Sequence, residues 1–161
     1  MPTFTTKRVV AHGALDMFDL VADVEHYPEF LPLCEALKVQ SRSAGGDGSE
    51  LITARLTVGY GPIRESFLSR VCLDRPGRLI RVDYLDGPFR SLENRWTFRD
   101  HAHGAEVEFF IAYEFKSLAL QLLMGAMFDT AFRKYQSAFE ARADAIYGHG
   151  KASATPAPSG A

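Results

Sequence analysis

The chain has 161 residues, of which 47% are hydrophobic and 24% are charged, and its formal net charge is −2. This composition is ordinary for a globular protein and excludes collagen-like, coiled-coil and wholly disordered classes. At roughly 100–200 residues per domain, we expect one domain around a single core. No apolar run approaches the ~20 residues of a spanning helix, and the first residues lack the hydrophobic region of a signal peptide. We therefore expect a cytoplasmic protein.

The first elements are predicted to be a strand and two short helices. Residues 3–10 are rich in Thr and Val and predict a strand. In residues 14–22 apolar side chains recur at three-residue spacing, which indicates a short amphipathic helix. Pro28 and Pro32 interrupt the next segment, so a second helix must be short and must end before Pro32.

Residues 36–115 are predicted to form six strands. Apolar residues there recur with a period of two, and turns containing Gly, Pro or Asp separate the segments. The connections are too short for crossover helices, so neighbouring strands must pair antiparallel. The alternation of Leu92, Asn94, Trp96 and Phe98 with polar residues predicts one buried and one solvated face.

A long helix is predicted to follow Ser117, a residue type that caps helices, and to reach Tyr147. Its second half has an ordinary apolar stripe. Its first half, residues 118–128, is apolar nearly all round and requires burial on several sides, an apolar ligand or a partner. Residues 148–161 are rich in Ala, Ser, Pro and Gly and are expected to form a disordered tail.

These elements together predict an α+β fold in which a bent, seven-stranded antiparallel sheet wraps around the long C-terminal helix. Such a sheet cannot close flush on a helix, so a concave apolar space is expected between them. Spaces of this kind are the default site for a ligand.

Four stretches carry a resemblance to a known family: residues 27–34 (YPEFLPLC), 82–92 (VDYLDGPFRSL), 94–98 (NRWTF) and 113–117 (YEFKS). They resemble the coenzyme-Q-binding protein family of the START-like, helix-grip superfamily, whose bacterial members include ribosome association toxins. The superfamily also groups polyketide cyclase-like proteins. The resemblance covers about residues 3–147 and implies that residues 1–147 form a START-like lipid- or quinone-binding domain.

The resemblance implies a non-enzymatic carrier or chaperone that binds a hydrophobic ligand and serves respiratory electron transport. Ubiquinone is the first candidate for this ligand. It implies no cofactor other than ubiquinone as a bound ligand, and a transient contact with the surface of the inner membrane. A regulator that binds the large ribosomal subunit and blocks subunit association is the alternative. Nine arginines in residues 55–99 favour it, because phosphate contacts dominate RNA affinity, whereas the net charge of −2 disfavours it. DNA is not an expected partner.

Catalytic motifs are missing from the sequence, which contains no GxSxG, HExxH, Walker glycine loop or GxGxxG after a strand. His101 and His103 could hold a metal weakly, but a solvated turn is the stronger interpretation. His12 and His26 have no acid at a recognisable spacing. We therefore expect no catalytic residue and no metal site, and a polyketide cyclase or dehydratase is the least favoured function.

Several polar side chains are expected to point inward. Asn94 lies between large apolar neighbours and must bond to backbone, water or a ligand carbonyl, since an unpaired amide would cost about 1–3 kcal/mol. Glu65 and Ser69 are further inward candidates, although Glu65 also suits a solvated sheet end. Cys34 and Cys72 have no CxxC partner and are interpreted as free thiols.

The ligand is predicted to lie between the sheet and residues 118–128, with its head near Asn94 or the mouth of the cavity and its tail against Leu120, Met124 and Met127. Methionines there also suit a gap-filling core. Aromatic residues near Pro28 and Pro88 are expected at the mouth, unless their loops pack on one another. The predicted ligand-binding residues are Tyr27, Phe30, Leu31, Phe67, Tyr84, Phe89, Asn94, Trp96, Leu120, Met124, Met127 and Phe128.

Overall fold

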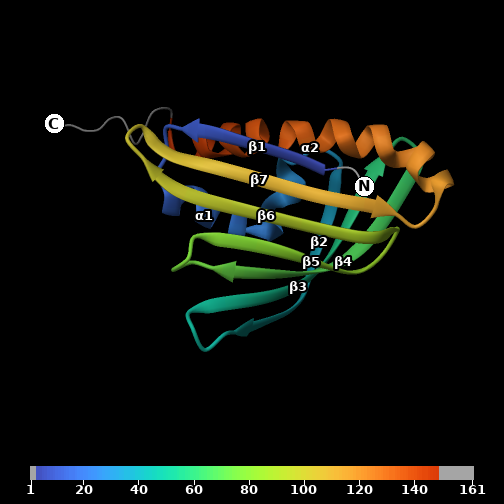
Figure 1. Cartoon of the computed structure of the whole chain (residues 1–161), viewed down its shortest axis with the longest axis horizontal. Coiled ribbons are helices and arrows are strands. Elements are labelled where there is room, and N and C mark those ends of the chain that lie inside the picture. Colours follow the sequence, from blue (N-terminus) through green and yellow to red (C-terminus); the bar gives the residue numbers. More distant parts are fainter. Residues whose placement is uncertain (1–2, 149–161) are drawn as a thin grey trace.

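The computed structural model describes residues 3–148 (Figure 1). The elements in chain order are β1 (Thr3–Val10), α1 (Ala14–Ala22), the 3-10 helix η1 (Val24–Glu29), β2 (Cys34–Ala44), β3 (Ser49–Tyr60), β4 (Ile63–Asp74), β5 (Leu79–Asp86), β6 (Phe89–His101), β7 (Gly104–Phe115) and α2 (Leu118–Tyr147). The predicted strand, two short helices, six strands and long helix are confirmed. The tail predicted for residues 148–161 lies outside the described residues, apart from Gly148.

All seven strands belong to one antiparallel sheet in the order β1-β7-β6-β5-β4-β3-β2. The first strand therefore lies beside the last, while the other strands follow each other as a meander. Register shifts occur within β2, at Leu68 and Ser69 where β4 begins to pair with β5, and between Phe89 and Ser91 where β6 begins to pair with β7. Such bulges bend a sheet, and Figure 1 shows the sheet curving away from β1 and β7 toward β2. The predicted α+β helix-grip fold is confirmed.

Helix α2 begins where the sequence predicts. The Ser117 hydroxyl accepts a hydrogen bond from the backbone N–H of Leu120 at 3.2 Å, which satisfies one of the open donors of the first turn. Leu118, Leu122 and Leu123 in the first two turns face solvent. Within residues 3–148, no helix is long and apolar enough to cross a membrane.

The core is built largely from aromatic rings. Trp96 in β6 lies 4.6 Å from Phe109 in β7 and 5.0 Å from Phe139 in α2, measured between ring centroids. A second cluster at the other end of the helix joins Phe89 to Phe115 at 4.8 Å. Rings at these separations contribute packing beyond their buried area. Phe128 of α2 joins the second cluster at 5.5 Å from Phe89, so the two clusters hold α2 against the concave face of the sheet at two points along the helix.

Candidate functional site

A cavity of about 100 Å³ lies between the concave face of the sheet and the second half of α2. We call it the inner cavity. Strands β2 to β7, α2, η1 and the turn after η1 supply its walls. Its lining consists of Val24, Tyr27, Leu31, Cys34, Leu37, Ala54, Leu56, Phe67, Ser69, Val71, Ile80, Val82, Leu92, Asn94, Trp96, Ile111, Phe132, Tyr135 and Phe139.

Two polar side chains of the sheet point into this otherwise apolar space. The Ser69 hydroxyl oxygen is buried and has no hydrogen-bond partner in the structure. The Asn94 side-chain amide donates to the carbonyl oxygen of Phe110 at 2.8 Å, which fulfils the expectation that this amide bonds to backbone. Since a buried polar group without a partner is costly, the free hydroxyl of Ser69 is suited to meet a polar atom of a ligand.

The inner cavity is electrically neutral. Burial raises the pKa of the Cys34 thiol to about 12, and burial likewise raises the pKa values of Tyr27 and Tyr135 above the ordinary range of tyrosine. Among the described residues that line the cavity, none is an Asp, Glu, His, Lys or Arg. The site therefore suits an uncharged, largely apolar molecule with a small polar part.

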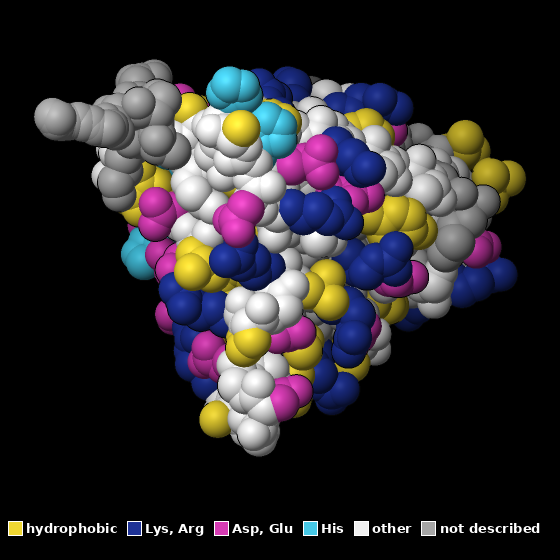
Figure 2. All heavy atoms as spheres, turned by 60° about the vertical axis from the view of Figure 1, so that its left-hand side comes forward, with side chains coloured by type: hydrophobic (Ala, Val, Ile, Leu, Met, Phe, Trp, Pro, Cys, Tyr) yellow, Lys and Arg dark blue, Asp and Glu magenta, His cyan; other side chains and the backbone are white. Residues whose placement is uncertain are grey.

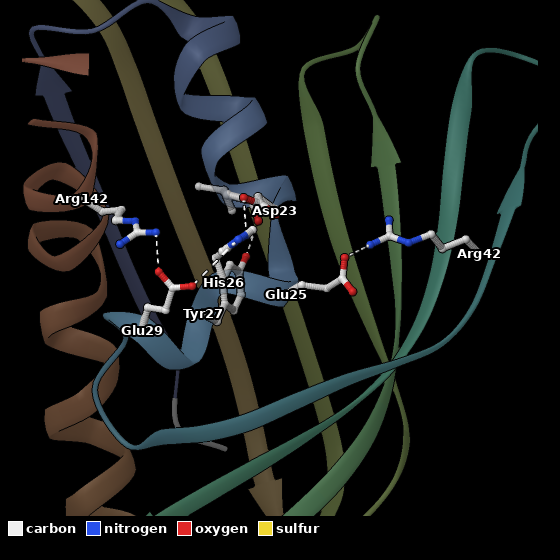
Figure 3. Close-up of polar contacts among 8 residues, drawn as sticks. Asp23, Glu25, His26, Tyr27, Glu29, Arg42 and Arg142 are labelled. Carbon is white, nitrogen blue, oxygen red and sulfur yellow. Dashed lines mark hydrogen bonds and ion pairs between the residues drawn. The ribbon is translucent and has the colours of Figure 1, made fainter. Parts of the chain in front are cut away.

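Helix η1 closes one side of the inner cavity through Val24 and Tyr27, and ion pairs hold it in place (Figure 3). Glu25 contacts Arg42 of β2 at 2.7 Å, and Glu29 contacts Arg142 of α2 at 2.9 Å. Between them, the Tyr27 hydroxyl donates to the backbone oxygen of Val21. These contacts tie the wall to a strand on one side and to the long helix on the other.

His26 faces solvent on the same helix, and its Nδ1 lies 2.7 Å from the Asp23 carboxylate. The hydrogen bond to Asp23 and the charge of that carboxylate raise the pKa of His26 above its ordinary value of 6.5, with a smaller contribution from Glu29. Because the folded pKa exceeds the unfolded one, the pair stabilises the fold fully below about pH 6.5, and this contribution is lost as the pH rises through the folded pKa.

Asp23→Asn is expected to lower the pKa of His26 toward 6.5, because it removes the hydrogen-bonding carboxylate. An NMR titration of the His26 ring protons measures the shift. Glu25→Gln is the matched control, since this carboxylate contacts Arg42 instead of the imidazole. Equal pKa values in Asp23→Asn and the unmodified protein would contradict the assignment.

Five predicted ligand-binding residues line the inner cavity: Tyr27, Leu31, Phe67, Asn94 and Trp96. They come from η1, the following turn, β4 and β6, so the fold brings together side chains that are up to 69 positions apart in sequence, from 27 to 96. Met127 lines a separate hollow on the outside of the protein.

The other six predicted residues do not line the inner cavity, which lies further along α2 than residues 118–128. Phe89 and Phe128 pack ring to ring at 5.5 Å and fill the space beside the first half of α2. Met124 is fully buried, and Leu120 packs against the same core. The cavity lies further along the helix, against Phe132, Tyr135 and Phe139.

The aromatic residues expected at the mouth have defined packing partners. Phe30 packs on Phe139 at 5.2 Å and lies under the guanidinium of Arg142. The hydroxyl of Tyr84 accepts a hydrogen bond from the backbone N–H of Phe89 at 3.0 Å, so this pair closes the β5–β6 turn. Phe30 therefore packs on α2, whereas Phe89 packs within its own turn and on Phe115 and Phe128.

The helix residues that do line the cavity were missed as site residues. Phe132, Tyr135 and Phe139 recur at spacings of three and four, which the sequence presents as an ordinary core stripe. The histidines lie elsewhere. His12 is buried, with Nε2 2.7 Å from an Asp144 oxygen, 132 positions away. No spacing rule could have revealed this pair, and it lies outside the cavity.

The remaining polar candidates are also distant from the inner cavity. Glu65 does not line it. His101 Nδ1 accepts a hydrogen bond from the backbone N–H of His103 in the exposed β6–β7 turn. Within residues 3–148, no group of three or more His, Cys, Asp and Glu side chains is placed to hold a metal ion.

Comparison with known proteins finds relatives over nearly the whole chain. Residues 10–140 match the family described as polyketide cyclase / dehydrase and lipid transport. The ribosome association toxin RatA of Rickettsia prowazekii is 32% identical over 149 residues, covering 91% of this chain and 99% of the relative. The mitochondrial coenzyme Q-binding protein COQ10 of Drosophila melanogaster is 33% identical over 141 residues, covering 84% of this chain and 56% of the relative.

Solved structures agree on the fold. An 18 kDa protein from Caulobacter crescentus matches with a TM-score of 0.75 at 34% identity, covering 92% of this chain and 99% of that one. The Zhui aromatase/cyclase from Streptomyces matches with a TM-score of 0.73 at 16% identity, covering 89% and 93%. At that identity the second likeness concerns the fold alone.

Proposed function

Because this chain belongs to the family of coenzyme Q-binding proteins and ribosome association toxins, within the polyketide cyclase / dehydrase and lipid transport group, we propose that it carries a hydrophobic quinone. The ligand is ubiquinone or a close analogue, bound by residues 1–147 with its ring in the inner cavity. The protein acts in the cytoplasm and touches the inner membrane transiently, where it supplies the quinone to respiratory enzymes.

The observation that carries this proposal is a neutral, apolar cavity with two polar side chains on one wall. A quinone is an uncharged ring that offers carbonyl oxygens and no acidic proton. The Ser69 hydroxyl, which has no partner of its own, can donate to one of those carbonyl oxygens. The side chains around the ring would be the aromatic and aliphatic walls supplied by Trp96 and the neighbouring strands.

The same lining supports a carrier over a cyclase. Proton transfer in a cyclase requires a positioned acid or base near neutral pKa. The lining residues offer hydroxyls, an amide and a thiol, and burial raises the pKa of the Cys34 thiol to about 12. None of these groups exchanges protons readily at neutral pH, which supports a non-enzymatic role.

Ser69→Ala is expected to weaken quinone binding about threefold to tenfold, the usual net contribution of one hydrogen bond. The melting temperature should not fall, because the hydroxyl has no partner to lose in the folded protein. Quenching of Trp96, the only tryptophan, by a decyl-tailed ubiquinone analogue measures the affinity. Ser66→Ala on the same strand is the control, since its hydroxyl accepts a hydrogen bond from Arg55.

If the quinone binds equally to Ser69→Ala and the unmodified protein, Ser69 does not contact the ring. If the quinone analogue does not quench the fluorescence of Trp96 in the unmodified protein and is lost on dialysis, the carrier proposal itself fails. Extraction of lipid from the purified protein followed by mass spectrometry would then identify any other ligand.

A second candidate is binding to the large ribosomal subunit, which the name of the Rickettsia relative suggests. The arginines of residues 55–99 lie on strands and turns of the outer surface, but most are matched by acids. Seven of the nine form ion pairs: Arg64, Arg75, Arg78, Arg81, Arg90, Arg95 and Arg99. Figure 2 shows basic and acidic side chains interspersed over one face. Co-sedimentation with large subunits in place of quinone binding would favour this candidate.

A further inference from the structure

A second hollow, which we call the outer groove, lies on the flank of α2 outside the inner cavity. It has a volume of about 460 Å³ and runs between the helix, the turn after η1 and the start of β4. In Figure 1 the β3–β4 hairpin curves toward the first half of α2. Apolar residues dominate its walls, among them Leu33, Ile63, Leu123 and Met127.

Two polar residues, Thr130 and Lys134, line the outer groove, and the rest of its wall is apolar. The hydroxyl of Thr130 donates to the backbone oxygen of Ala126 at 2.9 Å and is thereby satisfied within the helix. Lys134 lies at one end. At the other end Leu123 is 60% exposed, next to the 78% exposed Leu122. Large apolar side chains at these exposures favour burial against an apolar partner.

A single turn separates the outer groove from the inner cavity. Leu31 and Cys34 line the inner cavity, whereas Pro32 and Leu33 between them line the outer groove. On the helix side the same division runs between adjacent residues, with Lys134 in the groove and Tyr135 in the cavity. The same turn and the same stretch of α2 therefore border both hollows.

This turn is strained at Leu33, which has a φ of +66°. Such a conformation is unfavourable for a bulky L-residue, and strained residues of this kind cluster at ligand clamps and switch regions. The carbonyl oxygen of Leu33 accepts a hydrogen bond from the N–H of Gly59 at 3.0 Å, which helps to hold the turn in place. The strained residue therefore lies in the wall that borders both hollows.

The volumes of the inner cavity and the outer groove give the reason why the two should join. Pockets for drug-sized ligands measure about 300–1,000 Å³, so the inner cavity of about 100 Å³ is too small for a tailed quinone. The outer groove of about 460 Å³ supplies the missing space next to it.

We propose that the inner cavity and the outer groove are two halves of one elongated site, in which the inner cavity holds the ring and the outer groove holds the apolar tail. This inference rests on the proposed function and specifies its ligand as a flat, uncharged ring with a long hydrocarbon tail. The turn formed by residues 31–34 is the element that moves to admit it.

The test blocks the outer groove without touching the core. Ala126 is exposed and lines the groove, so Ala126→Phe fills it with a ring. The matched control is Ala141→Phe, an exposed alanine of the same helix, 15 residues further on and outside both hollows. Neither change adds a tryptophan, so quenching of Trp96 still reports the ring. The probes are the dimethoxy-methyl-benzoquinone ring without a tail and its decyl derivative.

We expect Ala126→Phe to weaken binding of the decyl quinone about tenfold or more, because several methylenes lose their buried contacts. Its affinity for the tailless ring should not change, and Ala141→Phe should affect neither probe. If Ala126→Phe leaves the decyl affinity intact, or weakens both probes equally, the two-part site is wrong while the carrier function stands. If neither probe binds the unmodified protein, the carrier function fails instead.

Discussion

Ending the chain before Ser117 is expected to leave a protein without a cooperative thermal transition. Helix α2 covers the rings of the concave face: Phe139 lies 5.0 Å from Trp96, and Phe128 lies 5.5 Å from Phe89. Losing the burial of one large aromatic side chain costs about 3–5 kcal/mol, and a typical domain has only about 5–15 kcal/mol in total. Several such losses at once exceed the stability of the fold.

Circular dichroism during heating measures this result. The control ends after Gly148, so that α2 is kept and only residues 149–161 are removed. That variant should melt cooperatively at the temperature of the full chain, as the predicted dispensability of the tail requires. A sharp transition in the variant without α2 would contradict the arrangement described here.

Phe139→Ala is expected to lower the free energy of unfolding by about 3–5 kcal/mol, the usual cost of removing a buried phenylalanine ring. The ring is 1% exposed and contacts three others, with centroids 5.4 Å from Tyr27, 5.2 Å from Phe30 and 5.0 Å from Trp96. It joins η1, β6 and α2, so its loss also loosens the wall of the inner cavity.

Urea denaturation measures the change through the midpoint at an unchanged slope. Ile146→Ala on the same helix is the control, because Ile146 is 50% exposed. Substitutions at exposed positions usually change stability by less than about 0.5 kcal/mol. A loss smaller than about 1 kcal/mol in Phe139→Ala would mean that the ring is not packed between these elements.

The order and type of the elements could be predicted because each rests on local signals. Alternation identifies β6 through Asn94 and Trp96, and Ser117 identifies the start of α2 by its capping side chain. Short turns between strands exclude crossovers, which fixes the meander. Such signals lie within a few residues of the element they define.

The position of the cavity could not be predicted in this way. It depends on which apolar side chains fill the space under the helix. Phe89 and Phe128 fill it near the start of α2, whereas near Tyr135 the bent sheet leaves it open. Both regions of the sequence carry apolar residues at helical spacing, so hydrophobic periodicity does not distinguish a filled core from a lined cavity.

Contacts between distant residues were also beyond prediction. Arg142 and Glu29 pair across 113 positions, and their meeting depends on the angle at which α2 crosses the sheet. The sequence shows that residues 118–128 are apolar nearly all round, but it does not distinguish burial from an apolar ligand or a partner. In the structure the apolar residues of this segment differ in burial: Met124 faces the core, whereas Leu122 is exposed beside the outer groove.

The pairing of the first strand with the last one has a consequence for biosynthesis. Residues 3–10 of β1 pair with residues 105–112 of β7, so β1 leaves the ribosome long before its partner has been translated. The nascent chain must therefore keep an unpaired edge while some hundred residues are added, and contacts of this range close slowly. Helix α2 is translated last of all the described elements. Because α2 supplies one wall of the inner cavity, the cavity is complete only after this last helix has been translated.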